Sequence, residues 1–422
     1  MSSGGIRPRR SSRSIIRPMD ARAILTTYRY RMAGTTQVAG IAPEGSPIGS
    51  GPTRPTDRAL APDLARGAML LFIALANSHT FLASTGSIRT YPTDGTVLDS
   101  ITAAILTMVV DGRSYTLFAA LFGYGLVQIW HRRERSGADW PSARKLLRRR
   151  GRWLILFGFV HGILLFYGDI LAAYGLLALI FVGALRWKDR TIMAWSGFFA
   201  VTGSLLYGLA SLPTPAMPSQ PNPLMAMLER AGTVLGMAPF GAFTAACAFL
   251  LGVWAARRRV LEDTDRYRPM LRRLVAIGIP VAVLGGLPLA LLTSGIVPDP
   301  GFGLAWGLGV LHTLTGYLGG PAYAALIALL ALRIRNTSGA VVQAVSAVGQ
   351  RSMTCYLTQS VVWMVLFEPY TLGLSDELGT APIALVAIAT WLVTVLMAEA
   401  MRRANQRGPF EVLIRRAVYR AG

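Results

Sequence analysis

The amino-acid sequence predicts an all-α protein: a polytopic transmembrane helical bundle of about ten spans with both termini in the cytoplasm. Three observations predict this fold class. Of the 422 residues, 53% are hydrophobic and only 15% are charged, whereas soluble domains carry about 25% charged residues. The mean hydropathy is +0.45. Apolar runs of roughly 20 residues, enough to cross a bilayer core of about 30 Å, recur along the chain.

The first 57 residues differ in composition from the rest of the chain. They are rich in Arg, Ser, Gly and Pro and lack the clustered apolar residues of a core, which is typical of disorder. The short run Ala23-Ile24-Leu25 is not long enough for the apolar part of a secretory signal. We therefore expect a disordered basic cytoplasmic tail at 1–57, a helical bundle at 58–400 and a basic cytoplasmic C-terminal tail at 401–422.

Ten apolar segments within the bundle are candidates for membrane spans. The turn Tyr167-Gly168-Asp169 alone separates the third from the fourth, so we expect these two to form a tight antiparallel hairpin. The expected spans are 62–83, 114–131, 152–167, 169–185, 191–212, 232–256, 272–294, 302–332, 351–367 and 380–400.

The basic residues predict the orientation of these spans. The formal charge is +21, from 42 Lys and Arg against 21 Asp and Glu. Of the 42 cations, 37 lie in the N-terminal tail, the C-terminal tail and four alternate connections, whereas the opposite connections hold only Arg89, Arg113 and Arg230. Such segregation is typical of cytoplasmic loops. It favours a cell-membrane protein surrounded by the lipid bilayer and argues against a nucleic-acid-binding surface.

The same orientation rule decides two ambiguous segments. Residues 98–110 are apolar but short, and counting them as a span would move the basic segment 132–152 to the other side, so we expect an interfacial or re-entrant helix. The Gly319-Gly320-Pro321 sequence interrupts 302–332. We expect one long helix there, kinked or partly re-entrant at this point.

Several kinds of chemistry lack their sequence signals. Cys247 and Cys355 both lie in apolar segments and are expected to be core residues rather than a disulfide pair. The sequence has no phosphate-binding Gly-x-x-x-x-Gly-Lys-Ser/Thr loop, no His-Glu-x-x-His helix and no Cys-x-x-Cys pair. We therefore expect no metal and no bound cofactor.

Ionisable residues inside apolar segments are the natural functional candidates, because a charge in hydrocarbon costs about 2.5 to 3.5 kcal/mol. Asp63 and Arg66 share a helix face at the start of the first span, either as a ligand-binding pair or as an interfacial ion pair. His161 precedes Asp169 by eight residues, and His312 lies in the middle of the eighth span. Each histidine suits either a general base or a structural hydrogen bond between helices.

Further polar residues lie at the span ends. Asp111 and Arg113 flank a glycine on the expected outer face, where they suit either an acceptor site or the ordering of a loop. Arg351 and Gln359 belong to a polar stripe at the start of the ninth span, suited to lining a cavity or binding phosphates. His79 lies near the outer end of the first span.

Several motifs together resemble the YeiB-like bacterial membrane proteins, a family of unknown function grouped with the multi-span membrane acyltransferases. The resemblance covers about residues 58–420. Its motifs are Arg58-Ala-Leu-Ala-Pro-Asp63-Leu-Ala-Arg66-Gly67, Leu117-Phe-Ala-Ala-Leu-Phe122-Gly123-Tyr-Gly125, Arg148-Arg-Arg, Leu156-Phe-Gly158-Phe-Val-His161-Gly162, Tyr167-Gly168-Asp169-Ile170-Leu171, Gly349-Gln-Arg351-Ser-Met-Thr354-Cys-Tyr356-Leu-Thr-Gln359-Ser360 and Gly408-Pro409-Phe410-Glu411.

The resemblance implies transfer of an acyl group from cytoplasmic acyl-CoA, as co-substrate, to an extracytoplasmic hydroxyl or amine of a glycan or lipid acceptor. The acetyltransferase relatives are thought to use a histidine near the outer half of the bundle, for which this sequence offers His79 or His161. A transporter of a small solute or lipid-linked molecule and a non-catalytic membrane protein are the alternatives. The expected donor-binding residues are Asp63, Arg66, Arg148, Arg149, Arg150, Arg351 and Gln359.

Overall fold

The structure is a computed structural model, which describes Met1 and residues 60–83, 86–215, 220–298, 301–334 and 339–419. Apart from Met1, the expected N-terminal tail at 1–57 lies outside the described residues.

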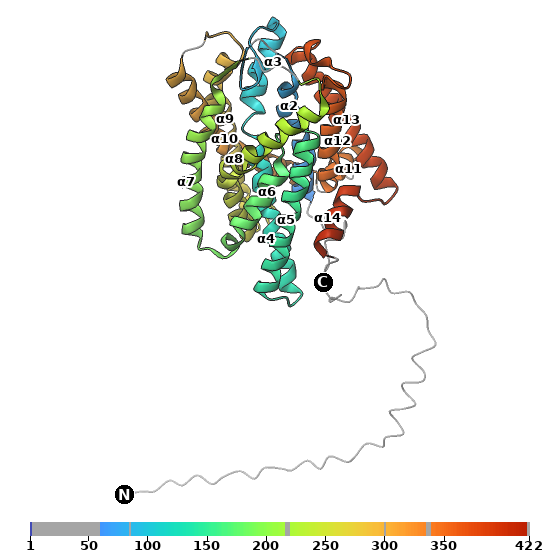
Figure 1. Ribbon diagram of the computed structural model, residues 1–422. Helices are drawn as coiled ribbons and strands as arrows, with labels where there is room; N and C mark the ends of the chain where they lie inside the picture. The colour runs from blue at the N-terminus through green and yellow to red at the C-terminus, as the bar shows by residue number, and fades with distance from the viewer. Residues whose placement is uncertain (2–59, 84–85, 216–219, 299–300, 335–338, 420–422) are drawn as a thin grey trace. The chain divides into compact units, whose positions relative to one another are not determined.

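The described chain is predominantly helical, as the sequence predicts, and its helices pack side by side into a bundle (Figure 1). The short 3-10 helices are η2 (His79–Phe81), η3 (Val182–Arg186), η4 (Leu209–Ser211) and η5 (Leu374–Asp376). The α-helices are α2 (Leu60–Ser78), α3 (Val97–Val109), α4 (Ser114–Arg135), α5 (Trp140–Leu164), α6 (Ile170–Ile180), α7 (Asp189–Gly208), α8 (Pro223–Arg257), α9 (Thr264–Thr293), α10 (Phe302–Arg333), α11 (Ala340–Gln350), α12 (Ser352–Phe367), α13 (Thr380–Arg403) and α14 (Pro409–Tyr419).

The helices have the length and composition of a membrane bundle. Seven helical segments in the described part of the chain are long and apolar enough to cross a membrane. Six contain α2, α7, α8, α9, α10 and α13, and the seventh, Val97–Arg135, contains both α3 and α4. The other three expected spans fall on α5, whose first half is basic, and on the shorter apolar helices α6 and α12. The transmembrane helical fold is therefore confirmed, whereas the number of ten crossings stays a prediction.

Three local expectations can be compared with the helix boundaries. The helix α10 runs unbroken through Pro321, so 302–332 is one helix rather than two. The helices α5 and α6 form the expected hairpin, because only residues 165–169 separate them and they pack against each other. The helix α3 is separate from α4, since the turn between them places Gly112 at a φ of 75°.

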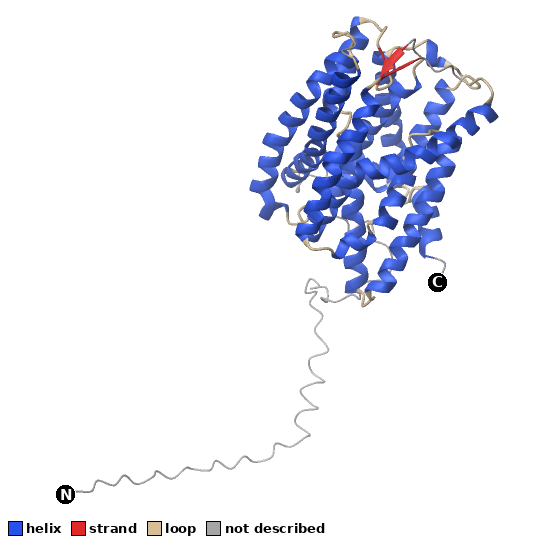
Figure 2. Cartoon of the chain, turned by 60° about the vertical axis from the view of Figure 1, so that its left-hand side comes forward, coloured by secondary structure: helices blue, strands red, loops and turns tan. Residues whose placement is uncertain are grey.

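A small antiparallel sheet joins two connections at one end of the bundle (Figure 2). The strand β1 (Gly86–Ile88) lies between β2 (Tyr91–Pro92) and β3 (Pro213–Pro215), with Ser87 opposite Pro92 on one side and Thr214 on the other. The sheet therefore links the segment after α2 to the segment after α7.

Glycines allow the closest helix approaches in the core. A Cβ at Gly252 of α8 would overlap the carbonyl oxygen of Ala120 in α4, and one at Gly349 of α11 would overlap that of Asp63 in α2. The largest buried hydrophobic cluster lies beside the first of these contacts, around Phe249 and Leu177. Small residues at such crossings are typical of membrane helix packing.

We predict that Gly252→Ala destabilises the bundle, because the added methyl group forces α4 and α8 apart. Overpacking of this kind costs about 1 to 3 kcal/mol. Gly236→Ala on the same helix is the matched control, because a Cβ there would meet no atom within 4 Å. Thermal unfolding in detergent should show a lower midpoint for Gly252→Ala only; equal midpoints for the two variants would contradict the packing account.

Candidate functional site

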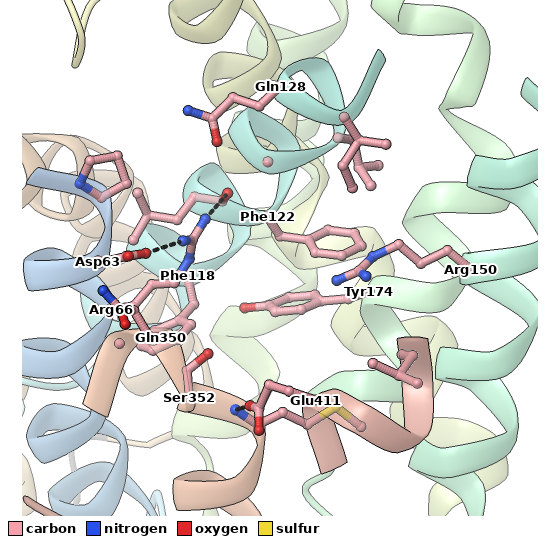
Figure 3. A pocket seen from close by; sticks show the side chains of 18 of the residues that line it. Asp63, Arg66, Phe118, Phe122, Gln128, Arg150, Tyr174, Gln350, Ser352 and Glu411 are labelled. Atoms are coloured by element: carbon pink, nitrogen blue, oxygen red, sulfur yellow. Dashed lines mark hydrogen bonds and ion pairs between the residues drawn. The ribbon is translucent and has the colours of Figure 1, made fainter. Parts of the chain in front are cut away.

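A cavity of about 760 Å³ lies between α2, α4, α5, α6, α12 and α14 (Figure 3). Its lining follows α4 from Phe118 to Arg135, and at 1.5 Å per helical residue this stretch is about 25 Å long. Near Phe118 the lining is apolar and aromatic, with Leu70, Ile73 and Phe122. We call this the inner end, and the part lined by the last turn of α4 the mouth.

The lining has an excess of positive charge. It contains seven arginines and four acidic residues, so an anion is favoured there over a cation. The arginines are Arg66, Arg132, Arg133, Arg135, Arg150, Arg259 and Arg415, and the acids are Asp63, Glu134, Glu262 and Glu411.

The predicted pair Asp63 and Arg66 lines this cavity. Arg66 Nη1 donates to Asp63 Oδ1 at 3.1 Å, and Arg66 Nη2 donates to the carbonyl oxygen of Leu121 at 3.4 Å. Arg66 therefore connects α2 to α4 while remaining part of the lining. Arg150 comes from α5, where it lies beside Tyr174 (Figure 3).

The other expected donor-binding residues are not part of the lining. Arg149 donates to the carbonyl oxygen of Val418 in α14. Arg351 donates to the carbonyl oxygen of Gln406 at 3.2 Å, and Gln359 donates to that of Leu70 at 3.4 Å. Arg148 is exposed. These contacts explain Arg149, Arg351 and Gln359 as groups that hold main-chain segments in place.

Glu411 lies in the cavity wall, although the sequence analysis did not select it as a site residue. Its Oε1 accepts hydrogen bonds from the backbone N–H groups of Met353 at 2.8 Å and Thr354 at 3.1 Å, at the start of α12. A carboxylate at a helix N-terminus satisfies N–H groups that have no partner within the helix. Glu411 belongs to the Gly408-Pro409-Phe410-Glu411 motif of the family resemblance, which marks the residue but does not identify its partner.

His161 and Asp169 form the buried pair that the sequence suggested. His161 Nδ1 lies 2.8 Å from Asp169 Oδ1, and the Asp169 side chain is 1% exposed. Asp169 Oδ2 accepts the backbone N–H of Ala172 at 2.6 Å and so caps α6. His161 Nε2 is buried without a hydrogen-bond partner among the described residues.

The His161–Asp169 pair adjoins the inner end of the cavity. The His161 ring lies 5.2 Å from the ring of Tyr356, measured between centroids, and Tyr356 lines the cavity. Ile170 and Leu171, which directly follow Asp169, also line it. A ligand filling the inner end would therefore be next to this histidine.

His79 belongs to a different buried group, at the sheet end of the bundle. Its ring stacks on Tyr91 with centroids 3.8 Å apart, and the Tyr91 hydroxyl donates to Asp111 Oδ2 at 3.0 Å. His79 Nδ1 and Asp111 Oδ1 are buried and have no hydrogen-bond partner among the described residues.

Arg113 and His312 complete this second group. Arg113 is fully buried, and its Nη1 lies 3.1 Å from each ring nitrogen of His312 and 3.3 Å from the Thr107 carbonyl oxygen. A histidine can accept from a guanidinium only through an unprotonated nitrogen. The structure thus places His79, His312, Asp111 and Arg113 in one cluster and the His161–Asp169 pair in another.

A buried ion pair that sequence reasoning missed supports the end of α5. Arg230 of α8 donates to Glu368 Oε1 at 2.8 Å, to the Tyr370 hydroxyl at 2.9 Å and to the Ile163 carbonyl oxygen at 2.9 Å. Burial raises the pKa of Glu368, and Arg230 opposes that shift. Ile163 lies two residues after His161, so this ion pair helps to fix the position of the histidine.

No metal site is evident in the described part of the chain. Among residues 60–83, 86–215, 220–298, 301–334 and 339–419, no three His, Cys, Asp or Glu side chains are grouped as metal ligands. Cys247 and Cys355 are both buried and unbridged.

We predict that Glu411→Ala loosens α14 from the bundle, because α12 loses its capping carboxylate. Hydrogen bonds to charged groups contribute about 1.5 to 3 kcal/mol each. Hydrogen exchange followed by mass spectrometry should show faster exchange over 409–419 in this variant. Glu399→Ala, which removes the carboxylate bound to exposed Arg402 and Arg403, is the control; unchanged exchange in both variants would contradict the role assigned to Glu411.

Comparisons with known proteins agree with the motifs. Residues 255–421 match the family described as "Protein of unknown function (DUF418)". The chain is 28% identical over 406 residues to "Uncharacterized protein YxaH" of Bacillus subtilis (strain 168), covering 87% of this chain and 96% of that protein. It is 26% identical over 394 residues to "Uncharacterized protein YeiB" of Escherichia coli (strain K12), covering 86% of this chain and 97% of that protein. These matches confirm the resemblance to the YeiB-like proteins: the chain is similar to them over most of its length, and its described part is a predominantly helical bundle with the composition of a membrane protein.

Proposed function

We propose that this protein is a membrane acyltransferase that takes an acyl group from cytoplasmic acyl-CoA and transfers it to an extracytoplasmic hydroxyl or amine acceptor. One observation carries this proposal: a buried histidine held by a carboxylate adjoins the inner end of a positively charged cavity. Acyl-CoA combines an anionic phosphate-bearing part with a long arm and a thioester, which suits a cavity with a cationic mouth and an apolar inner end.

The His161–Asp169 geometry suits general-base chemistry. A hydrogen bond from Nδ1–H to Asp169 leaves the lone pair on Nε2, where it can accept the acceptor's proton. The acceptor oxygen or nitrogen then attacks the thioester carbon. When the C–S bond breaks, CoA leaves as a thiolate and takes the proton from His161. The products are the acylated acceptor and CoA, and no redox partner is required.

Arg66 and Arg150 are the proposed donor-binding residues, because they come from α2 and α5 on two sides of the lining. Asp111 and Arg113 belong to the cluster at the sheet end and are proposed to act on the acceptor side. The basic mouth of the cavity lies at the α4–α5 connection, which the charge distribution assigns to the cytoplasm. Both termini are proposed to lie there too, outside the bundle of 58–400.

We predict opposite accessibility for cysteines introduced at the two ends of the bundle. Thr214→Cys in strand β3 should react with a membrane-impermeant maleimide in intact cells, because β3 is proposed to be extracytoplasmic. Ala404→Cys, after α13, should react only once the membrane is broken. Both positions are exposed, and the native Cys247 and Cys355 are buried. Labelling of Ala404→Cys in intact cells would reverse the proposed orientation.

We predict that His161→Ala lowers the rate of acyl transfer by about 10²- to 10⁴-fold, the usual contribution of a general base. The assay uses protein in nanodiscs with radiolabelled acyl-CoA and glycan or lipid acceptors. Ser204→Ala, which removes a buried hydroxyl bonded within α7, controls for unrelated core changes.

Two outcomes would contradict this assignment. A loss of transfer in His79→Ala or His312→Ala, with full activity in His161→Ala, would move the reaction to the cluster at the sheet end. Solute flux into liposomes without any acyl donor, with no acylated product, would identify a transporter instead.

A further inference from the structure

Tyr356 is an unsatisfied hydrogen-bond donor at the inner end of the cavity. The residue is 3% exposed, and its hydroxyl has no hydrogen-bond partner among the described residues. Buried polar groups in folded proteins are nearly always hydrogen-bonded, because leaving one unpaired costs stability. A phenol that lines a cavity in this state is suited to donate to a ligand.

A second source of donors lies beside this hydroxyl. The helix α6 begins at Ile170, and its first N–H groups have no carbonyl partner within the helix. The Asp169 carboxylate accepts a hydrogen bond from one of them, the N–H of Ala172. Ile170, Leu171 and Tyr356 all line the cavity, so the start of α6 and this hydroxyl face the same space.

A hydrogen-bond acceptor, the side chain of His161, lies next to these donors. His161 Nε2 is buried without a partner in the described chain, and the His161 and Tyr356 rings are 5.2 Å apart between centroids. The inner end therefore combines unpaired donors with an unpaired nitrogen that can accept a proton. A carbonyl compound attacked by a hydroxyl or amine needs both, since negative charge develops on the carbonyl oxygen while a proton leaves the nucleophile.

We propose that the Tyr356 hydroxyl, with the first N–H groups of α6, binds the carbonyl oxygen of the ligand's acyl group and stabilises the oxyanion formed there. This subsite rests on the proposed acyl transfer and adds Tyr356 to it as a catalytic residue. As the acceptor bonds to the carbon, the carbonyl electron pair moves onto the oxygen and is held by these donors. When the C–S bond breaks, this electron pair re-forms the carbonyl double bond.

The neighbouring contacts fix the position of Tyr356. It lies in α12, directly after the turn that Glu411 caps, and Thr354 next to that cap also donates to Glu411. On the other side, Arg230 holds the end of α5 through the Ile163 carbonyl oxygen. The hydrogen-bond donor Tyr356 and the base His161 therefore come from separately anchored helices, which favours a preorganised site.

The test compares ligands that differ only in the carbonyl group. Acetyl-CoA and its thioether analogue S-ethyl-CoA, in which CH₂ replaces the carbonyl, are titrated into protein in nanodiscs. Wild type should bind acetyl-CoA about three- to tenfold more tightly, as expected for a hydrogen bond to one ligand oxygen. Tyr356→Phe should show a weaker preference for acetyl-CoA than wild type, because only the α6 N–H groups remain as donors, and should lower any transfer rate by about 10²- to 10³-fold. Tyr317→Phe, which removes a buried hydroxyl bonded to Thr244, should keep the wild-type preference.

The outcomes separate this inference from the proposed function. If wild type catalyses no transfer but prefers acetyl-CoA, and Tyr356→Phe weakens that preference, the carbonyl subsite stands and the acyltransferase proposal fails. If transfer occurs and Tyr356→Phe retains both the preference and the rate, the subsite is overturned while the acyltransferase stands. A wild type that binds the two ligands equally, or binds neither, also overturns the subsite.

Discussion

The two hydrogen bonds of Asp169 are the interaction on which the candidate site depends. One oxygen of this carboxylate holds His161, and the other caps α6 through Ala172. A single side chain thus sets both the orientation of the histidine and the start of the helix that lines the inner end of the cavity. The contact requires Gly158, because a Cβ at that position would overlap Asp169 and the backbone of Ala172.

The cavity gains its ligand preference from helices that are far apart in the sequence. Three of its seven arginines come from the last turn of α4, and the others come from α2, α5, α14 and the turn after α8. Its inner end adds aromatic and aliphatic side chains from α2, α4 and α6. The C-terminal helix α14 forms part of the wall, held by Glu411 at one end and by Arg149 through Val418 at the other. Within the basic C-terminal segment, Pro409–Tyr419 thus forms a helix in the cavity wall.

The sequence pattern was sufficient to predict the helices and the contacts between residues that are close in the sequence. Apolar runs predicted the helical segments, and short spacings predicted the Asp63–Arg66 and His161–Asp169 pairs. Contacts between distant segments were not predictable, since nothing in a single sequence shows that Glu411 meets Met353 or that Arg230 meets Glu368. Arg351 shows the converse: its place in a polar stripe suggested a ligand contact, but its guanidinium is bonded to the Gln406 carbonyl oxygen.

The central claim is that the ligand's acyl group reaches the His161–Asp169 hairpin from the charged cavity. Photocrosslinking measures this most directly, with a CoA thioester that carries a diazirine in its acyl group and peptide mapping by mass spectrometry. The account predicts adducts within 158–174 and 352–360, reduced by excess unlabelled acyl-CoA. Adducts confined to the cluster of His79, Asp111, Arg113 and His312, or labelling that excess acyl-CoA does not reduce, would contradict it.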